Sequence, residues 1–141
     1  MFVGVCMKIA VFSFLILLGS LQPSFAHEYQ ETGQVSVAPA DRYFGKMKMS
    51  ILGVRNSIND LTATISLNPE SFNSVIHKAE MVEDVLHDWA TQYPTDPWLP
   101  KYTHSLVVLY QKCHETGDIH RLRTQDWLNE KFPDSTFADA F

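Results

Sequence analysis

Four side chains that can bind a metal ion recur along one predicted helix. They are His77, Glu80, Asp84 and His87, separated by three, four and three residues. Because helical residues three or four positions apart are neighbours on the surface, all four are expected along one face. Imidazole and carboxylate groups are suitable ligands for zinc, copper or nickel. The pattern therefore predicts either a metal or small-ligand site or an ordinary solvent-exposed polar face.

Two features favour the solvent-exposed face. The four residues lie opposite the apolar positions of the same helix, and an exposed helix face needs polar residues in any case. The chain also lacks a His-Glu-x-x-His motif, which places two zinc ligands and a base on one helix. The metal site is kept as the alternative function, and the leading function requires no cofactor.

The remaining reactive residues do not form a catalytic motif. The chain has no Gly-x-Ser-x-Gly sequence and no glycine-rich phosphate loop. Cys113 falls on a predicted buried stripe, where a thiol is inert. Since Cys6 lies in a predicted export signal, Cys113 is the only cysteine expected in the mature chain, which excludes an intramolecular disulfide. We therefore expect a protein that is not an enzyme.

The first 26 residues have the pattern of a cleavable signal peptide. Lys8 gives a positive start, residues 9–18 are apolar apart from Ser13, and residues 24–26 (Ser-Phe-Ala) place small residues where a signal peptidase reads. The apolar run is shorter than the roughly 20 residues of a transmembrane helix. We expect a mature chain that begins at His27, has no membrane anchor, and is periplasmic or secreted.

The charge of the mature chain limits its partners. Without Lys8 the 11 basic residues fall to 10 against 16 acidic ones, which is a formal net charge of −6. Nucleic-acid binding needs a basic face, so nucleic acid is excluded as a partner. Residues 27–40 are polar and contain Gly33 and Pro39, which predicts a flexible N-terminal segment before a folded region at 41–141.

The folded region has the periodicity of an all-α domain. Apolar residues recur every three or four positions over residues 44–65, which predicts a helix with Asp41 as its N-cap. The same spacing continues over residues 72–93 and follows Asn68-Pro69, a typical cap and first helical residue. Pro94 ends this second helix. The short link predicts an antiparallel hairpin.

A second hairpin is expected after three prolines between residues 94 and 100, where Trp98 and Leu99 should fold back onto the first hairpin. The third helix is predicted from about residue 100 to Gly117 and is apolar nearly all round. It is therefore either the central helix, which we favour, or an exposed partner surface. Asp118 is the expected cap of a fourth helix that Pro133 ends. These four amphipathic helices form either a closed bundle or a short solenoid.

The second hairpin resembles a tetratricopeptide-type repeat. Tyr110 and Cys113 lie late in its first helix, Gly117-Asp118 and Ile119 follow at the predicted turn, and Pro133 closes its second helix. The resemblance implies a scaffold or peptide-binding module rather than an enzyme.

The leading hypothesis is an exported, non-enzymatic helical protein that binds a protein or peptide partner in the cell envelope. Trp98, Val107 and Val108 are the predicted contacts, because they are apolar and lie at the elbow or off the main stripe of the third helix. The identity of the partner is open, and a second copy of the chain is one candidate.

Overall fold

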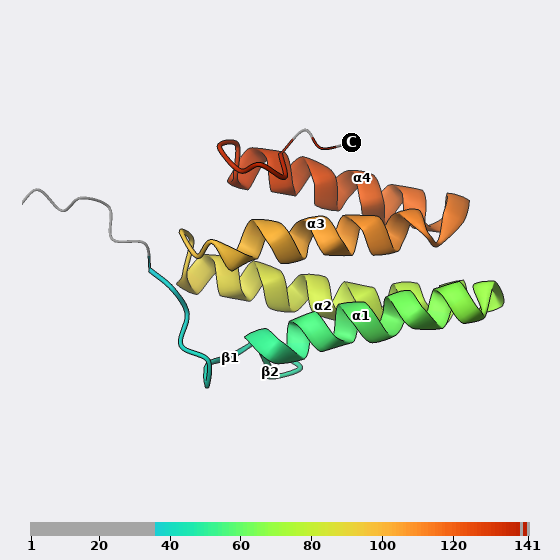
Figure 1. Ribbon diagram of the computed structural model, residues 1–141, viewed down its shortest axis with the longest axis horizontal. Coiled ribbons are helices and arrows are strands. Elements are labelled where there is room, and N and C mark those ends of the chain that lie inside the picture. The colour runs from blue at the N-terminus through green and yellow to red at the C-terminus, as the bar shows by residue number, and fades with distance from the viewer. Residues whose placement is uncertain (1–35, 139, 141) are drawn as a thin grey trace, which may run out of the picture. The chain divides into compact units, whose positions relative to one another are not determined.

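The computed structural model describes residues 36–138 and 140, which belong to one compact unit. The protein is all-α apart from one small hairpin, so the predicted fold class is confirmed (Figure 1). The predicted signal peptide and most of the predicted flexible segment lie outside the described residues. The elements are β1 (Tyr43–Phe44), β2 (Met49–Ser50), α1 (Ile51–Leu67), a 3-10 turn (Pro69–Ser71), α2 (Phe72–Gln92), α3 (Trp98–Gln111) and α4 (His114–Lys131).

The first helix begins ten residues later than predicted, because residues 41–50 form a β-hairpin. Strands β1 and β2 pair antiparallel, with Phe44 opposite Met49. Gly45 has a φ of +64°, and a Cβ there would lie 2.7 Å from Cγ2 of Val85 on α2. The turn therefore needs glycine both for its left-handed backbone and for its close approach to α2. Ser50 rather than Asp41 caps α1, accepting a 3.2 Å hydrogen bond from the Gly53 N–H.

The apolar stripes of α1 and α2 face each other and form most of the core. The buried positions of the two stripes are Val54, Ile58, Leu61, Ile65, Val75, Ala79, Val82, Leu86 and Trp89. Phe44 also belongs to the core, although a strand rather than a helix delivers it. Met47 falls within residues 44–65, where the periodicity predicts a helix, but it lies in the hairpin turn and is 52% exposed.

The link between α1 and α2 consists of residues 68–71. The backbone carbonyl of Asn68 accepts hydrogen bonds from the N–H and the hydroxyl of Ser71, at 3.0 and 2.6 Å. These bonds form the 3-10 turn in place of the predicted Asn68 side-chain cap. Helix α2 then ends at Gln92, two residues before Pro94, as predicted.

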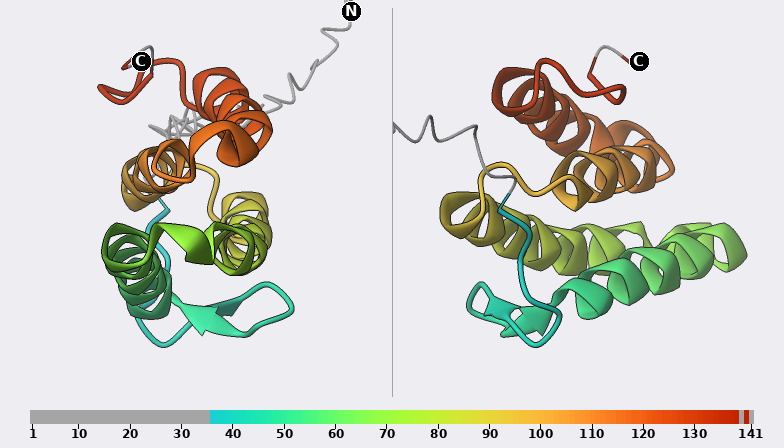
Figure 2. Two further views of the ribbon diagram at one scale, coloured as in Figure 1. Left: turned by 90° about the vertical axis from the view of Figure 1, so that its right-hand side faces the viewer. Right: turned by 60° about the vertical axis from the view of Figure 1, so that its left-hand side comes forward.

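Helix α3 lies between the first hairpin and α4, so its predicted central position is confirmed (Figure 2). It begins at Trp98, slightly before the predicted start. Of the two residues expected to fold back at the elbow, Leu99 is fully buried and Trp98 is 43% exposed. Tyr102, Leu106 and Leu109 on the main stripe are buried.

The turn between α3 and α4 differs from the prediction. Helix α3 ends at Gln111 and α4 begins at His114, so Gly117 and Asp118 are inside α4 rather than at its start. A Cβ on Gly117 would collide with the Tyr110 carbonyl oxygen and lie 2.9 Å from Cβ of Cys113. The glycine therefore serves the close packing of α4 on the end of α3. Asp118 pairs with Arg121, with Nε and Oδ1 at 3.3 Å.

The apolar residues of α4 are used differently from those of the other helices. Although α4 was expected to be amphipathic, its Ile119 and Leu122 are exposed, and Leu128 is its one fully buried large apolar residue among those the structure describes. Pro133 follows the end of the helix as predicted. Over the described part of the chain, none of the helices has the length and apolarity that a membrane span requires.

Candidate binding groove

The four residues predicted as metal ligands do not converge on one point. Asp84 faces the hairpin, with Oδ1 4.0 Å from Nζ of Lys46. His87 lies against α4, with its ring 4.3 Å from the ring of Trp127. Across residues 36–138 and 140, no three His, Cys, Asp or Glu side chains are placed to hold a metal ion together. The predicted four-ligand site is therefore not formed, because its helix face is divided between two neighbours.

His77 and Glu80, the other two members of that set, remain close together. Nδ1 of His77 lies 3.8 Å from Oε2 of Glu80. The second carboxylate oxygen of Glu80 lies 3.6 Å from Nδ1 of His120 on α4. Glu80 thus lies between two imidazoles, of which His77 is well exposed and His120 is mostly covered.

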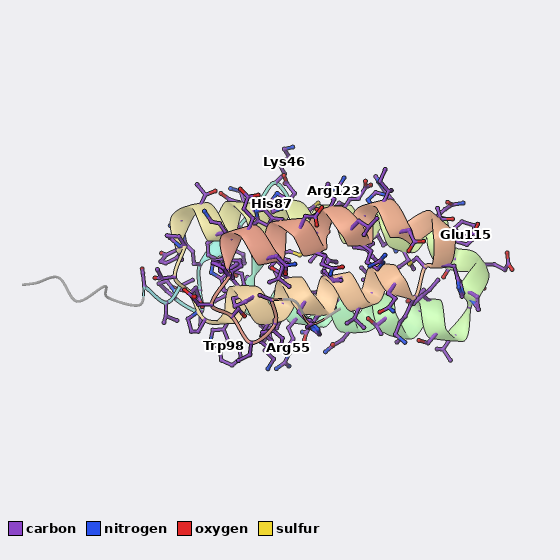
Figure 3. All side chains as sticks on the ribbon, turned by 90° about the horizontal axis from the view of Figure 1, so that it is seen from above. Lys46, Arg55, His87, Trp98, Glu115 and Arg123 are labelled. Carbon is purple, nitrogen blue, oxygen red and sulfur yellow. The ribbon has the colours of Figure 1, made fainter. Side chains whose placement is uncertain are left out.

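The three predicted partner contacts have different environments. Val107 is fully buried, so it cannot contact a partner in this structure, and the predicted contact is wrong at this residue. Val108 is half-buried. Trp98 stacks on Tyr102 with ring centroids 6.1 Å apart, and Nζ of Lys101 lies 5.1 Å from the centroid of its ring. Trp98 keeps an exposed face at the elbow, which Figure 3 shows on the opposite side of the view from Lys46.

A hollow lies between the β-hairpin, α1 and α2. Its volume is about 440 Å³, within the range of about 300–1,000 Å³ that is usual for ligand pockets. Its apolar lining comes from Met47, Met49, Leu61, Met81 and Val82. Its polar lining comes from Ser57, Asp60, Thr64, His77 and Lys78. We call this hollow the methionine groove.

A smaller hollow of about 280 Å³ adjoins the methionine groove on its hairpin side. Lys46, Glu80 and Asp84 line it, together with three residues that also line the methionine groove. The shared residues are Met47, His77 and Met81. These three side chains therefore lie where the two hollows meet.

Carboxylates of α2 hold the hairpin in place beside the groove. Oδ2 of Asp88 accepts a 2.6 Å hydrogen bond from the Gly45 N–H. This bond, helped by one from the Gln92 amide, holds the pKa of Asp88 below its usual value. The Phe44 ring stacks on the Trp89 ring at 5.4 Å. The hairpin, and with it Met47 and Met49, is thus anchored by both polar and apolar contacts.

A buried carboxylate on α2 binds α4. Glu83 is 5% exposed, and Arg123 donates to both of its oxygens, at 3.1 and 2.6 Å. The Tyr110 hydroxyl donates to Oε2 at 3.0 Å. The Thr124 hydroxyl lies 3.2 Å from Oε1 and also within 2.8 Å of the His120 carbonyl oxygen, to which it donates. Burial, with the nearby Glu83 charge, raises the pKa of Tyr110, and the bond to Glu83 raises that of Arg123. The two guanidinium nitrogens and the Tyr110 hydroxyl, with Thr124 beside them, make this cluster a structural joint between helices.

A second buried carboxylate organises the elbow. Asp96 accepts hydrogen bonds from Nε1 of Trp89 at 3.0 Å, from the Ala38 N–H at 2.8 Å and from the Trp98 N–H at 3.0 Å. Ala38 is buried by this contact. Residues 36–40, the last part of the segment predicted to be flexible, are therefore attached to the elbow. Sequence reasoning missed this, because the donor and acceptor are 58 residues apart.

The single described cysteine is buried, as predicted. Cys113 forms no disulfide. Its thiol donates a weak hydrogen bond to the Leu109 carbonyl at 3.6 Å. Burial raises its pKa, which disfavours the reactive thiolate.

The fold and the groove together define a small all-α domain of two helical hairpins with a β-hairpin on its first pair. Comparison of the chain with protein-family profiles, with curated proteins and with solved structures found no match. The tetratricopeptide resemblance of the second hairpin stays a prediction. The methionine groove was missed, although Met47 and Met49 alternate with lysine after Gly45 and Met81 follows His77 by four residues.

Proposed function

We propose that this domain is an exported, non-enzymatic interaction module that binds an apolar segment of a partner protein in the methionine groove. The observation that carries the proposal is the groove itself, an open hollow whose apolar walls come from two helices and a hairpin. A partner segment would bury two or three large apolar side chains there. The protein acts in the periplasm or outside the cell, following the sequence of its first 26 residues.

The chemistry of the walls supports a protein partner. Methionine side chains are flexible and polarizable, so a surface built from them adapts to different apolar side chains. Charged residues stand at the rim, with Lys78 and Asp60 beside the apolar floor. This arrangement of apolar centre and polar edge is the usual anatomy of a protein interface. A helical partner segment would present its apolar face at a spacing of three or four residues.

The predicted surface on α3 contributes little to this proposal. Val107 is withdrawn as a contact because it is buried. Trp98 remains a second contact, since exposed tryptophan is frequent among residues that dominate binding energy. It lies outside the groove lining, so it is proposed to hold a different part of the partner or a second copy of the chain.

Site-specific photo-crosslinking tests the proposal. A photo-reactive amino acid replaces Met47 in one variant and Leu52 in another, because these side chains are similarly exposed, at 52% and 55%, and only Met47 lines the groove. In envelope extract, the Met47 variant is expected to give one dominant adduct whose crosslinked peptide has an apolar segment. The Leu52 variant should not give that adduct.

A Met81→Asp substitution sharpens the result. It places a charge in the groove wall and should abolish the Met47 adduct while circular dichroism remains unchanged. Equal adducts from both crosslinking positions, or an adduct that survives Met81→Asp, would show that the groove is not the binding surface.

A further inference from the structure

All methionines among residues 36–138 line one groove. They are Met47 and Met49 from the hairpin and Met81 from α2. His77 joins them from the preceding turn of α2, four residues before Met81 and therefore on the same helix face. Met47, His77 and Met81 also line the smaller hollow. Four side chains that can donate sulfur or nitrogen to a metal thus gather from two elements separated in sequence.

This donor set differs in kind from the one that the sequence pattern predicted. Thioether sulfur is a soft ligand that favours copper(I) over zinc, magnesium or calcium, and imidazole also suits copper. Of the two carboxylates in the predicted set, Asp84 pairs with Lys46 and Glu80 lies beside the His77 ring. Because three of its four donors are thioethers, the groove should prefer a soft monovalent ion.

The surroundings of two of the donors fit metal binding. Oε2 of Glu80 lies 3.8 Å from Nδ1 of His77, and metal-bound histidines usually have a carboxylate or carbonyl beside the nitrogen that does not bind the metal. Nε2 would then be the ligand atom. Sδ of Met49 accepts a weak hydrogen bond from the Ser57 hydroxyl at 3.8 Å, which holds the side chain and leaves the second lone pair of the sulfur for an ion.

We propose that Met47, Met81 and His77, where the two hollows meet, bind a soft monovalent metal ion, copper(I), together with Met49 from the wall of the methionine groove. The inference goes beyond the proposed partner binding and does not depend on it. Partner binding requires the apolar surface of the methionines, whereas metal binding requires their sulfur atoms. A Met→Leu change keeps the first and removes the second.

Cys113 is the one competing soft ligand of the described residues. It is buried, its thiol donates to the Leu109 carbonyl, and burial raises its pKa. A thiol binds a metal as thiolate, so Cys113 is unsuited in the folded protein. A Cys113→Ala variant should keep the metal affinity of the wild type.

The decisive experiment is a titration of the untagged protein with silver(I), a redox-inert analogue, and with copper(I) under anaerobic conditions. Two-dimensional NMR of the methionine methyl groups is the readout, because a methyl beside a metal-bound sulfur shifts strongly. The methyl signals of Met47, Met49 and Met81 are expected to shift together and to saturate at one equivalent.

The matched variant replaces all three methionines by leucine. Its affinity for silver(I) should fall by at least about 100-fold, while its circular dichroism and its crosslinking through a probe at Ser57, another groove residue, are unchanged. A His77→Ala variant should lose affinity less severely, since three ligands remain. Unchanged affinity in the triple variant, loss of affinity in Cys113→Ala, or separate titration of the three methyl groups would overturn the proposal.

Discussion

The contact between α1 and α2 and the contact that holds α4 are built on different principles. The first buries two apolar stripes against each other, with residues such as Val54, Ile58 and Leu86 fully or almost fully covered. The second has one fully buried large apolar residue on α4, Leu128, and a polar joint around Glu83. Figure 1 shows the two hairpins that these contacts define.

The two contacts therefore contribute differently to the folding free energy and to the position of α4. Apolar burial contributes in proportion to area and depends weakly on direction. The Glu83 joint instead requires Arg123, Tyr110 and Thr124 to arrive at fixed angles from two other helices. We infer that the first contact supplies most of the folding free energy and that the second fixes where α4 lies. The predictions below test this division.

Removing apolar volume between α1, α2 and α3 should have the largest effect. Leu86→Ala deletes a fully buried side chain from the main cluster, and the lost transfer energy and cavity should cost about 3–4 kcal/mol. Urea unfolding at pH 7 measures the change. The control, Leu52→Ala at an exposed position, should change the free energy of unfolding by less than about 0.5 kcal/mol. Equal losses of unfolding free energy in Leu86→Ala and Leu52→Ala would contradict the inference that apolar burial supplies most of the folding free energy.

A methyl group at Gly117 should displace α4. The added Cβ would meet the Tyr110 backbone carbonyl, which cannot move without distorting α3, so Gly117→Ala should cost about 3 kcal/mol. Gly53→Ala is the matched control, because its nearest neighbours would lie at 3.5 Å or beyond and alanine favours a helix by up to about 1 kcal/mol. If thermal unfolding shows Gly53→Ala to be more destabilising than Gly117→Ala, the packing role of Gly117 is wrong.

Neutralising the polar joint should loosen α4 selectively. Glu83→Gln keeps the shape but weakens the bonds from Arg123, and we expect a loss of about 2 kcal/mol, reduced from that of a fully buried pair because Arg123 is partly exposed. Hydrogen exchange should accelerate in α4 far more than in α1. Glu80→Gln, which removes a more exposed charge, should leave α4 protected. Uniform acceleration in all helices would show that the joint also carries global stability.

The smallest effect is expected where a carboxylate holds the hairpin. Asp88→Asn weakens the bond from the Gly45 N–H and should cost about 1 kcal/mol at pH 7. Because the pKa of Asp88 is lowered in the folded state from its ordinary 3.8, the unfolded chain binds the proton first. The contribution is therefore present above pH 4 and lost as the pH falls through the lower, folded value.

The measurement for Asp88 is the difference in free energy of unfolding between wild type and variant from pH 7 to pH 2. It should be constant above about pH 5 and shrink towards zero at the acidic end. Asp126→Asn, at an exposed position, should show no such change. If the difference in unfolding free energy between wild type and Asp88→Asn grows as the pH falls, the pKa of Asp88 is not lowered by folding.

The sequence alone predicted the features that depend on periodicity and chain breaks. The stripes of α1 and α2, the end of α2 before Pro94 and the buried Cys113 follow from the spacing of apolar residues and the missing N–H of proline. Two apolar residues of the groove lining, Leu61 and Val82, belong to those stripes. Fold class and hairpin connectivity were therefore accessible without coordinates.

The tertiary structure alone decided the features that depend on residues far apart in the chain. Phe44 fits a helical period equally well, but its burial against Trp89 and the Gly45 turn against Val85 select a hairpin. Gly117 has the look of a helix end, yet its lack of a side chain serves the packing of α4 on α3. Local patterns report which residues prefer to be buried, whereas the partner that buries them, and so the methionine groove, is fixed only when the helices meet.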